Sequence, residues 1–68
     1  MTVPAASSTA AELAALADTL GRSRERVVGL AEPYLGTDRE DIVAAVYEAE
    51  RQLRGAERAL QRALKLLA

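Results

Sequence analysis

Residues 37–68 read TDREDIVAAVYEAERQLRGAERALQRALKLLA, with no proline and one glycine. The apolar side chains recur in a four-three alternation, which keeps them in one stripe along one side of a helix. The stripe consists of Ile42, Val46, Ala49, Leu53, Ala56, Leu60, Ala63 and Leu67. Leucine alternates with alanine in its second half, so a facing helix can approach closely at the alanines. We therefore predict one long amphipathic helix that packs against another helix.

The start of this helix is predicted at Thr37. A threonine followed three residues later by glutamate forms a capping box, in which the Thr37 hydroxyl accepts from the Glu40 amide and the Glu40 carboxylate accepts from the Thr37 amide. Acidic residues follow in the first turn and basic residues collect toward the other end, as the helix dipole favours.

The chain upstream of this helix allows two interpretations. We expect residues 1–8 to be flexible, because they are small and include a proline. Thr9 and Glu12 form a second capping box, and Gly21 followed by Ser23 favours a turn between two short helices within residues 9–32. Alternatively, Gly21 is only tolerated inside one interrupted helix. A shared heptad phase supports this alternative: Leu13, Leu16, Leu20, Val27, Leu30 and Tyr34.

Either interpretation gives an all-α fold, in which residues 9–68 form a single helical domain. Two short N-terminal helices, or one interrupted helix, fold back on the long C-terminal helix of residues 37–68. Pro33 disfavours helix continuation at the residue before it, and Gly36 permits the chain reversal.

The composition predicts self-association. Fifteen of the 34 apolar residues are alanine, and the chain has no Phe or Trp, so its core is thin. Domains of this size usually need a disulfide, a metal or a partner subunit, and a chain without Cys or His lacks the usual means for the first two. We expect a homodimer that forms a four-helix bundle. Its expected interface is Ile42, Val46, Ala49, Leu53, Ala56, Leu60, Ala63, Leu64 and Leu67.

Several protein classes are disfavoured. No apolar segment approaches the ~18 residues of a membrane span, and the first residues lack the basic region of a secretory signal, so we expect a soluble cytoplasmic protein with no membrane partner. Without His or Cys, no spaced group of acid, base or nucleophile is present, and no glycine-rich phosphate loop occurs. We therefore expect neither an enzyme nor a cofactor-binding protein.

Residues 16–30, LADTLGRSRERVVGL, resemble the helix-turn-helix of bacterial and phage DNA-binding proteins. The matching positions are Ala17, small where two helices cross, Gly21 in the turn, and Val27, which plugs the angle between the helices. The run from Ser23 to Val27 is also similar to the promoter-reading helix of sigma factors.

The resemblance implies a recognition helix over residues 23–32 in the major groove of double-stranded DNA. Ser23, Arg24 and Glu25 would face bases, whereas Arg22 and Arg26 would contact phosphates.

A basic ridge lies opposite the apolar stripe of the long helix and consists of Arg51, Arg54, Arg58, Arg62 and Lys65. Such a ridge can follow DNA phosphates or bind an acidic partner. It can equally be a solvated face whose charges pair locally, as Glu50 can with Arg54 four residues later.

Two functions follow from these patterns. The first is a homodimeric DNA-binding transcriptional regulator, with residues 9–32 reading DNA and residues 37–68 forming the dimer. The alternative is a non-catalytic helical-bundle module or accessory subunit that docks onto an unidentified protein, which the pI near 5.3 favours. The first requires Arg22, Arg24 and Arg26 to be exposed together, and the second requires an exposed apolar patch.

Overall fold

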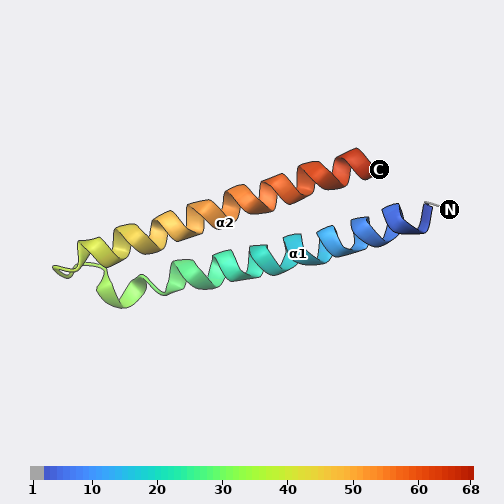
Figure 1. Ribbon diagram of the computed structural model, residues 1–68. Coiled ribbons are helices and arrows are strands. Elements are labelled where there is room, and N and C mark those ends of the chain that lie inside the picture. The colour runs from blue at the N-terminus through green and yellow to red at the C-terminus, as the bar shows by residue number, and fades with distance from the viewer. Residues whose placement is uncertain (1–2) are drawn as a thin grey trace.

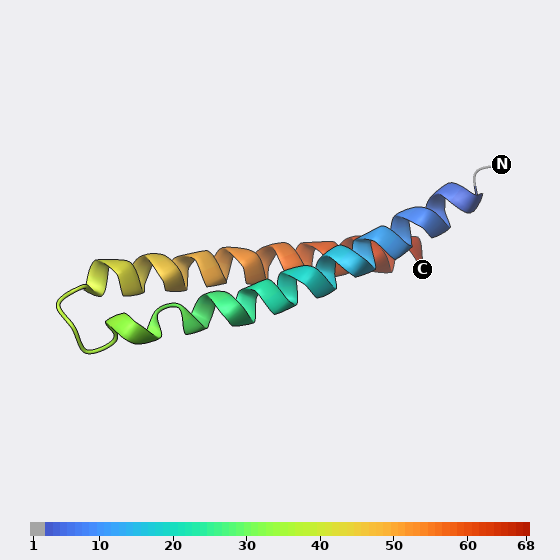
Figure 2. The ribbon, with the colours of Figure 1, turned by 90° about the horizontal axis from the view of Figure 1, so that it is seen from below.

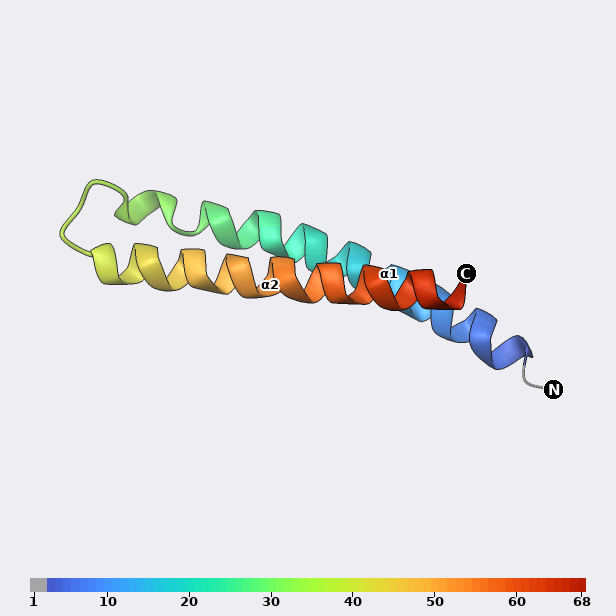
Figure 3. The same cartoon turned by 90° about the horizontal axis from the view of Figure 1, so that it is seen from above.

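The computed structural model describes residues 3–68, which form an antiparallel helical hairpin (Figure 1). Helix α1 spans Val3–Gly29, the short 3-10 helix η1 spans Glu32–Tyr34, and α2 spans Glu40–Leu67. The hairpin is a rod measuring 58 × 14 × 12 Å. Figures 2 and 3 show the two helices side by side near the loop and crossing near the termini. The all-α fold, with a long C-terminal helix packed against the preceding chain, is confirmed.

The preferred prediction of two short N-terminal helices is wrong, because α1 continues through Gly21 without a break. A glycine inside a helix costs only about 1 kcal/mol relative to alanine, which the neighbouring alanines and the packing against α2 offset. A Cβ atom at Gly21 would lie 3.0 Å from Oε2 of Glu57, so the glycine also leaves space for this carboxylate.

Helix α1 also begins earlier than the sequence predicted. It starts at Val3, so Thr9 lies inside the helix rather than at its N-terminal cap. Residues 3–8, which we expected to be flexible, are helical, whereas residues 1 and 2 lie outside the described residues. Pro4 is compatible with this start, because the first turn of a helix does not use the amide that proline lacks.

The capping box predicted at Thr37 is also wrong, because α2 begins at Glu40, with Arg39 at the cap position. The Thr37 hydroxyl instead donates to the Tyr34 carbonyl at 2.6 Å and accepts from the Arg39 amide at 3.1 Å. Gly36 adopts a φ of 75°, which glycine permits at low cost, and reverses the chain. Thr37 therefore shapes the loop rather than capping the helix.

The seam between α1 and α2 follows a heptad pattern on both helices. On α1 the seam positions are Leu13, Ala17, Leu20, Arg24 and Val27, and on α2 they are Val43, Val46, Glu50, Leu53, Glu57, Leu60 and Leu64. Among the described apolar residues, only Ala17 and Ala31 are buried, and no large side chain is fully buried. The hairpin therefore has helix packing but almost no enclosed core.

The apolar stripe predicted on α2 is only partly covered by α1. Val46, Leu53 and Leu60 are half-buried in the seam, whereas Ala49 and Ala56 are exposed. Leu67 at the end of α2 is 40% exposed, and Ile42, Ala63 and Leu64 are half-buried. Helix α1 thus packs toward one edge of the stripe, because Glu50 and Glu57 on that side bind Arg24.

Candidate interaction surfaces

One side of the seam is closed by a charged cluster of Arg24, Glu50, Arg54 and Glu57. Arg24 Nε donates to Glu57 Oε1 at 3.2 Å, and Arg24 Nη1 reaches Glu50 Oε2 at 3.5 Å. Arg54 binds the same Glu50 oxygen through Nη2 at 2.6 Å and Nε at 3.1 Å. The Arg24 side chain is 28% exposed, and Glu50 is buried at 7%. The cluster therefore ties the two helices together through a nearly buried carboxylate.

The electrostatics of the cluster favour its charged forms. Hydrogen bonds from Arg54 and then Arg24 lower the pKa of Glu50, although burial opposes them. The hydrogen bond to Glu57 raises the pKa of Arg24. Both groups therefore remain ionised near neutral pH, as expected of a structural cluster rather than of an acid or base that exchanges protons.

Along the opposite side of the seam runs a strip of residues without charge, bordered on α1 by Glu12 beside Leu16 and by Arg26 beside Ser23 and Leu30, and we call this strip the uncharged face. It consists of Leu16, Ser23 and Leu30 from α1 and of Ala45, Ala49, Gln52, Ala56, Ala59 and Ala63 from α2. Leu16 and Ser23 each precede a seam residue of α1 by one position, and Leu30 precedes the buried Ala31. Ala49, Ala56 and Ala63 likewise precede seam residues of α2 by one position. In an antiparallel helix pair, such rows lie on the same side of the seam.

The uncharged face is open to solvent. Leu16 is 53% exposed and Leu30 is 64% exposed, and only Ser23 and Ala63 of the set are half-buried. The adjoining leucines of the seam, such as Leu20 and Leu53, are also only half-buried. Exposed leucines and alanines in a strip of this length make the uncharged face a candidate interaction surface.

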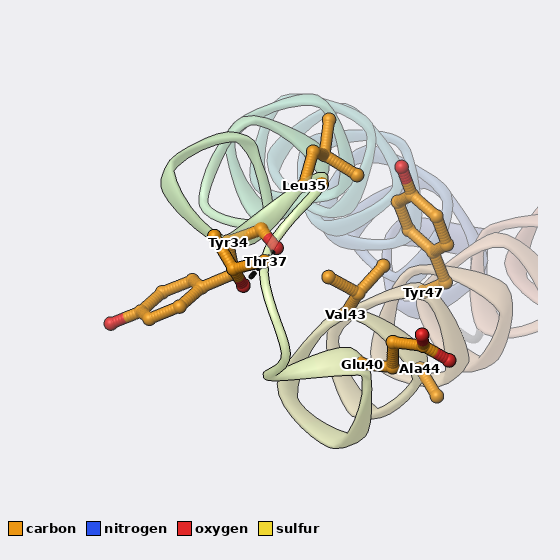
Figure 4. A pocket seen from close by; sticks show the side chains of 8 residues that line it. Tyr34, Leu35, Thr37, Glu40, Val43, Ala44 and Tyr47 are labelled. Carbon is orange, nitrogen blue, oxygen red and sulfur yellow. Dashed lines mark hydrogen bonds between the residues drawn. The ribbon is translucent and has the colours of Figure 1, made fainter.

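A shallow pocket of about 480 Å³ lies between the loop and the start of α2. In Figure 4, Leu35, Val43 and Tyr47 surround it, whereas the Tyr34 ring points away. Its only ionisable side chains are Glu40 and the two tyrosines, so it offers no paired acid and base.

The structure separates the residues that the helix-turn-helix resemblance brought together. Arg22 is exposed and pairs with Asp18 at 3.0 Å, and Arg26 is exposed one turn later. Arg24 instead turns toward α2. The other two residues of the predicted DNA-reading set differ from each other in exposure: Glu25 is exposed, whereas Ser23 is half-buried.

The seam positions of Glu50 and Glu57 were not predicted from the sequence. A signal was present, because these glutamates are seven residues apart and both lie in the four-three pattern that starts at Val43. Charged residues in such positions require a partner, and Arg24 on the facing helix supplies it.

The basic ridge divides into paired and unpaired halves. Arg51 binds Glu48, and Arg54 binds Glu50. Within residues 3–68, Arg58, Arg62 and Lys65 form no ion pair, and all three are exposed. The C-terminal half of α2 therefore presents three uncompensated cations.

Comparisons of the chain with protein-family models, curated proteins and solved structures found no match. Neither α1 nor α2, over the residues described, contains an apolar segment long enough to cross a bilayer. Among these same residues, no three Asp or Glu side chains gather as metal ligands.

Proposed function

We propose that this chain is a non-catalytic helical interaction module that acts as a homodimer, with the uncharged faces of two hairpins packed into a four-helix bundle. The observation that carries this proposal is the open uncharged face, which runs along both helices beside half-buried leucines. Every helix of a bundle must bury an apolar stripe, and one hairpin alone leaves half of that stripe in water.

The energetics support a partner of the same shape. Burying an exposed leucine contributes about 1.5–3 kcal/mol, and each hairpin contributes Leu16 and Leu30 to the face. The alanines of α2 permit close approach of another helix without loss of rotamer entropy. A second copy provides a matching uncharged face of the same length.

Sedimentation equilibrium of the wild type and of charged variants tests this proposal. Ala49→Glu and Ala56→Glu introduce a charge at exposed positions of the uncharged face, where the separate hairpin has room for it. We expect a wild-type dimer, and an increase of about a hundredfold in the dissociation constant for each variant, because a carboxylate would be buried without a partner.

The matched control is Ala15→Glu, which adds the same side chain at an exposed position on the side of α1 turned away from α2. It should leave the dimer intact. A monomeric wild type, or equal weakening by all three substitutions, would refute the homodimer.

A second candidate function is binding to double-stranded DNA. Its supporting observation is the unpaired cations Arg58, Arg62 and Lys65, which follow one side of α2 and could contact phosphates. Binding to mixed-sequence duplex DNA across a salt series tests it, with Arg58→Ala plus Arg62→Ala compared with Arg22→Ala plus Arg26→Ala. Selective weakening by the first pair would assign contact to the ridge, selective weakening by the second would assign it to α1, and no binding at low salt would exclude this function.

A further inference from the structure

We propose that the pocket between the loop and the start of α2 binds a basic segment of a partner protein, in which an apolar side chain lies beside an arginine or lysine. The pocket lies within one hairpin, so this inference goes beyond the proposed homodimer and does not depend on it. Its lining combines two parts of the chain: the loop supplies Leu35, and the start of α2 supplies Glu40, Val43 and Tyr47.

The walls of the pocket are apolar and open to solvent. Leu35 is 49% exposed and Tyr47 is 45% exposed, and Figure 4 shows both around the pocket with the half-buried Val43. Gly36 and Ala44 line it without adding bulk. At about 480 Å³, the pocket has room for a leucine or isoleucine side chain from another polypeptide. Apolar anchors that fill such pockets contribute most of the affinity of many interfaces.

The free charge at the pocket is negative. Glu40 lines it, is exposed, and forms no ion pair within the part of the chain that the structure describes. Arg39, the only basic residue between α1 and α2, is bound to Asp41 by two hydrogen bonds of 3.1 Å. The connecting segment has two more acidic residues that form no ion pair with described residues, Glu32 and Asp38. Glu40 is therefore available to a cation from outside the hairpin.

The groove beyond the pocket offers no competing cation. It continues along α2 past Tyr47 into a second hollow of about 270 Å³, which is lined by two ion pairs. In these pairs Arg51 binds Glu48, and Arg54 binds Glu50. A basic segment in the pocket therefore meets one free carboxylate and no free cation among the lining residues. This is the charge complementarity that selects a basic partner over an acidic one.

The proposed dimer leaves this pocket open. At about 100° per residue, Glu40, Ala44 and Tyr47 point to one side of α2. Ala49 and Ala56 of the uncharged face point to the nearly opposite side. A partner can therefore occupy the pocket of each hairpin whether or not the homodimer forms.

Titration with two synthetic peptides, followed through the amide chemical shifts of the protein, tests the proposal. Both peptides are alanine-rich helices with one leucine. In the first an arginine follows the leucine by four residues, which places the two side chains together, and in the second glutamine replaces the arginine. We expect saturable shifts at residues 35–47 with the arginine peptide and about threefold weaker binding of the glutamine peptide, since an exposed ion pair contributes up to about 1 kcal/mol.

Two pairs of variants locate the contact. Glu40→Gln should weaken the arginine peptide about threefold and leave the glutamine peptide unchanged. Its control, Glu25→Gln, removes an exposed carboxylate of α1 and changes the net charge equally, and should leave both affinities unchanged. Leu35→Ala should weaken both peptides about tenfold by removing an apolar wall. Leu66→Ala shortens an exposed leucine elsewhere and should have no effect.

The possible results are distinct. Saturable shifts at the pocket with this order of affinities support the proposal. An absence of shifts there at millimolar peptide, equal binding of the two peptides, or equal weakening by Glu40→Gln and Glu25→Gln would overturn it. If the same amides shift with protein concentration in the absence of peptide, the occupant is a second copy, and a basic partner is refuted. None of these results bears on the homodimer, which sedimentation of Ala49→Glu and Ala56→Glu tests separately.

Discussion

The two sides of the seam between α1 and α2 differ in how far side chains cover them. On one side, Arg24 reaches from α1 to Glu50 and Glu57 on α2, and Arg54 completes the cluster. On the other side, Leu16, Ala49 and Ala56 are exposed to solvent. Charge specifies how one chain folds on itself, whereas the uncharged face remains available to a second polypeptide.

This difference between the two sides explains why α1 has a defined register against α2 although so few side chains are buried. Ion pairs with directional hydrogen bonds fix which residues of α1 face which residues of α2, because a slip would remove the Arg24 partner of Glu57 and leave the buried Glu50 with Arg54 alone. Apolar contacts tolerate small slips more easily. We infer that register comes mainly from the charged cluster and that the proposed homodimer supplies most of the stability.

The largest effect is expected from Leu53→Ala, because Leu53 borders both the seam and the uncharged face. Removing its side chain should lower the free energy of unfolding by about 2–4 kcal/mol, measured by chemical denaturation. Leu66→Ala is the control, because Leu66 is 86% exposed and should change stability by no more than about 0.5 kcal/mol. Equal effects of the two substitutions would show that Leu53 does not occupy a core position.

The next largest effect is expected from Arg24→Ala. It leaves the buried Glu50 with Arg54 alone and removes the ion partner of Glu57, so the melting temperature should fall by about 5 °C in thermal unfolding followed by circular dichroism. Arg22→Ala removes only a pair whose side chains are 71% and 67% exposed and should have little effect. Similar losses in the two variants would mean that the cluster does not hold the helices together.

A smaller effect is expected on acidification. Pairing with Arg54 and Arg24 lowers the pKa of Glu50 in the folded protein below its ordinary value of 4.5, so the unfolded chain binds more protons in acid. The stability that this group contributes is complete above its ordinary pKa and is lost as pH falls through its folded pKa. The melting temperature should therefore decline below about pH 4.5. The decline should be smaller in Glu50→Gln, and an identical acid profile in that variant would contradict a role for Glu50.

The smallest effect is expected in the difference between two glycine substitutions. Gly55→Ala places its Cβ in open space and should stabilise the protein by about 1 kcal/mol through helix propensity. Gly21→Ala gains the same propensity, but its Cβ would lie 3.0 Å from the Glu57 carboxylate and push it from Arg24. We expect a smaller gain at Gly21, as measured by chemical denaturation. Equal gains would indicate that the Glu57 carboxylate moves without cost.

Much of the fold was predictable from residue periodicity. The long helix, its apolar stripe and its antiparallel packing followed from the four-three spacing between Ile42 and Leu67 and from the breaks at Pro33 and Gly36. The helix ends were less predictable. Thr9 and Thr37 both fit the sequence pattern of a capping box. Thr9 lies inside α1, because the residues before it are also helical, and the Thr37 hydroxyl instead bonds to the backbone of the loop. Local patterns of this kind compete with tertiary contacts that a sequence does not display.

The charged cluster was not predicted, because it depends on the rotation of α2 about its own axis. If α1 packed on the centre of the apolar stripe, Glu50 would lie at the edge of the contact between the two helices. The pairing with Arg24 brings Glu50 and Glu57 into the seam. Gly21 was misinterpreted for a related reason. Its small size matters for the approach of Glu57 from the facing helix, and not for a turn in its own helix.

Thermal unfolding at several protein concentrations tests whether a second copy covers the uncharged face. Unfolding of a homodimer releases two chains, so mass action raises the melting temperature as concentration increases. We predict a steady rise in the melting temperature over a hundredfold range of concentration, and a lower, concentration-independent value for Ala56→Glu. A wild-type melting temperature that does not change with concentration would contradict the homodimer, because the hairpin would then be stable with its uncharged face in water.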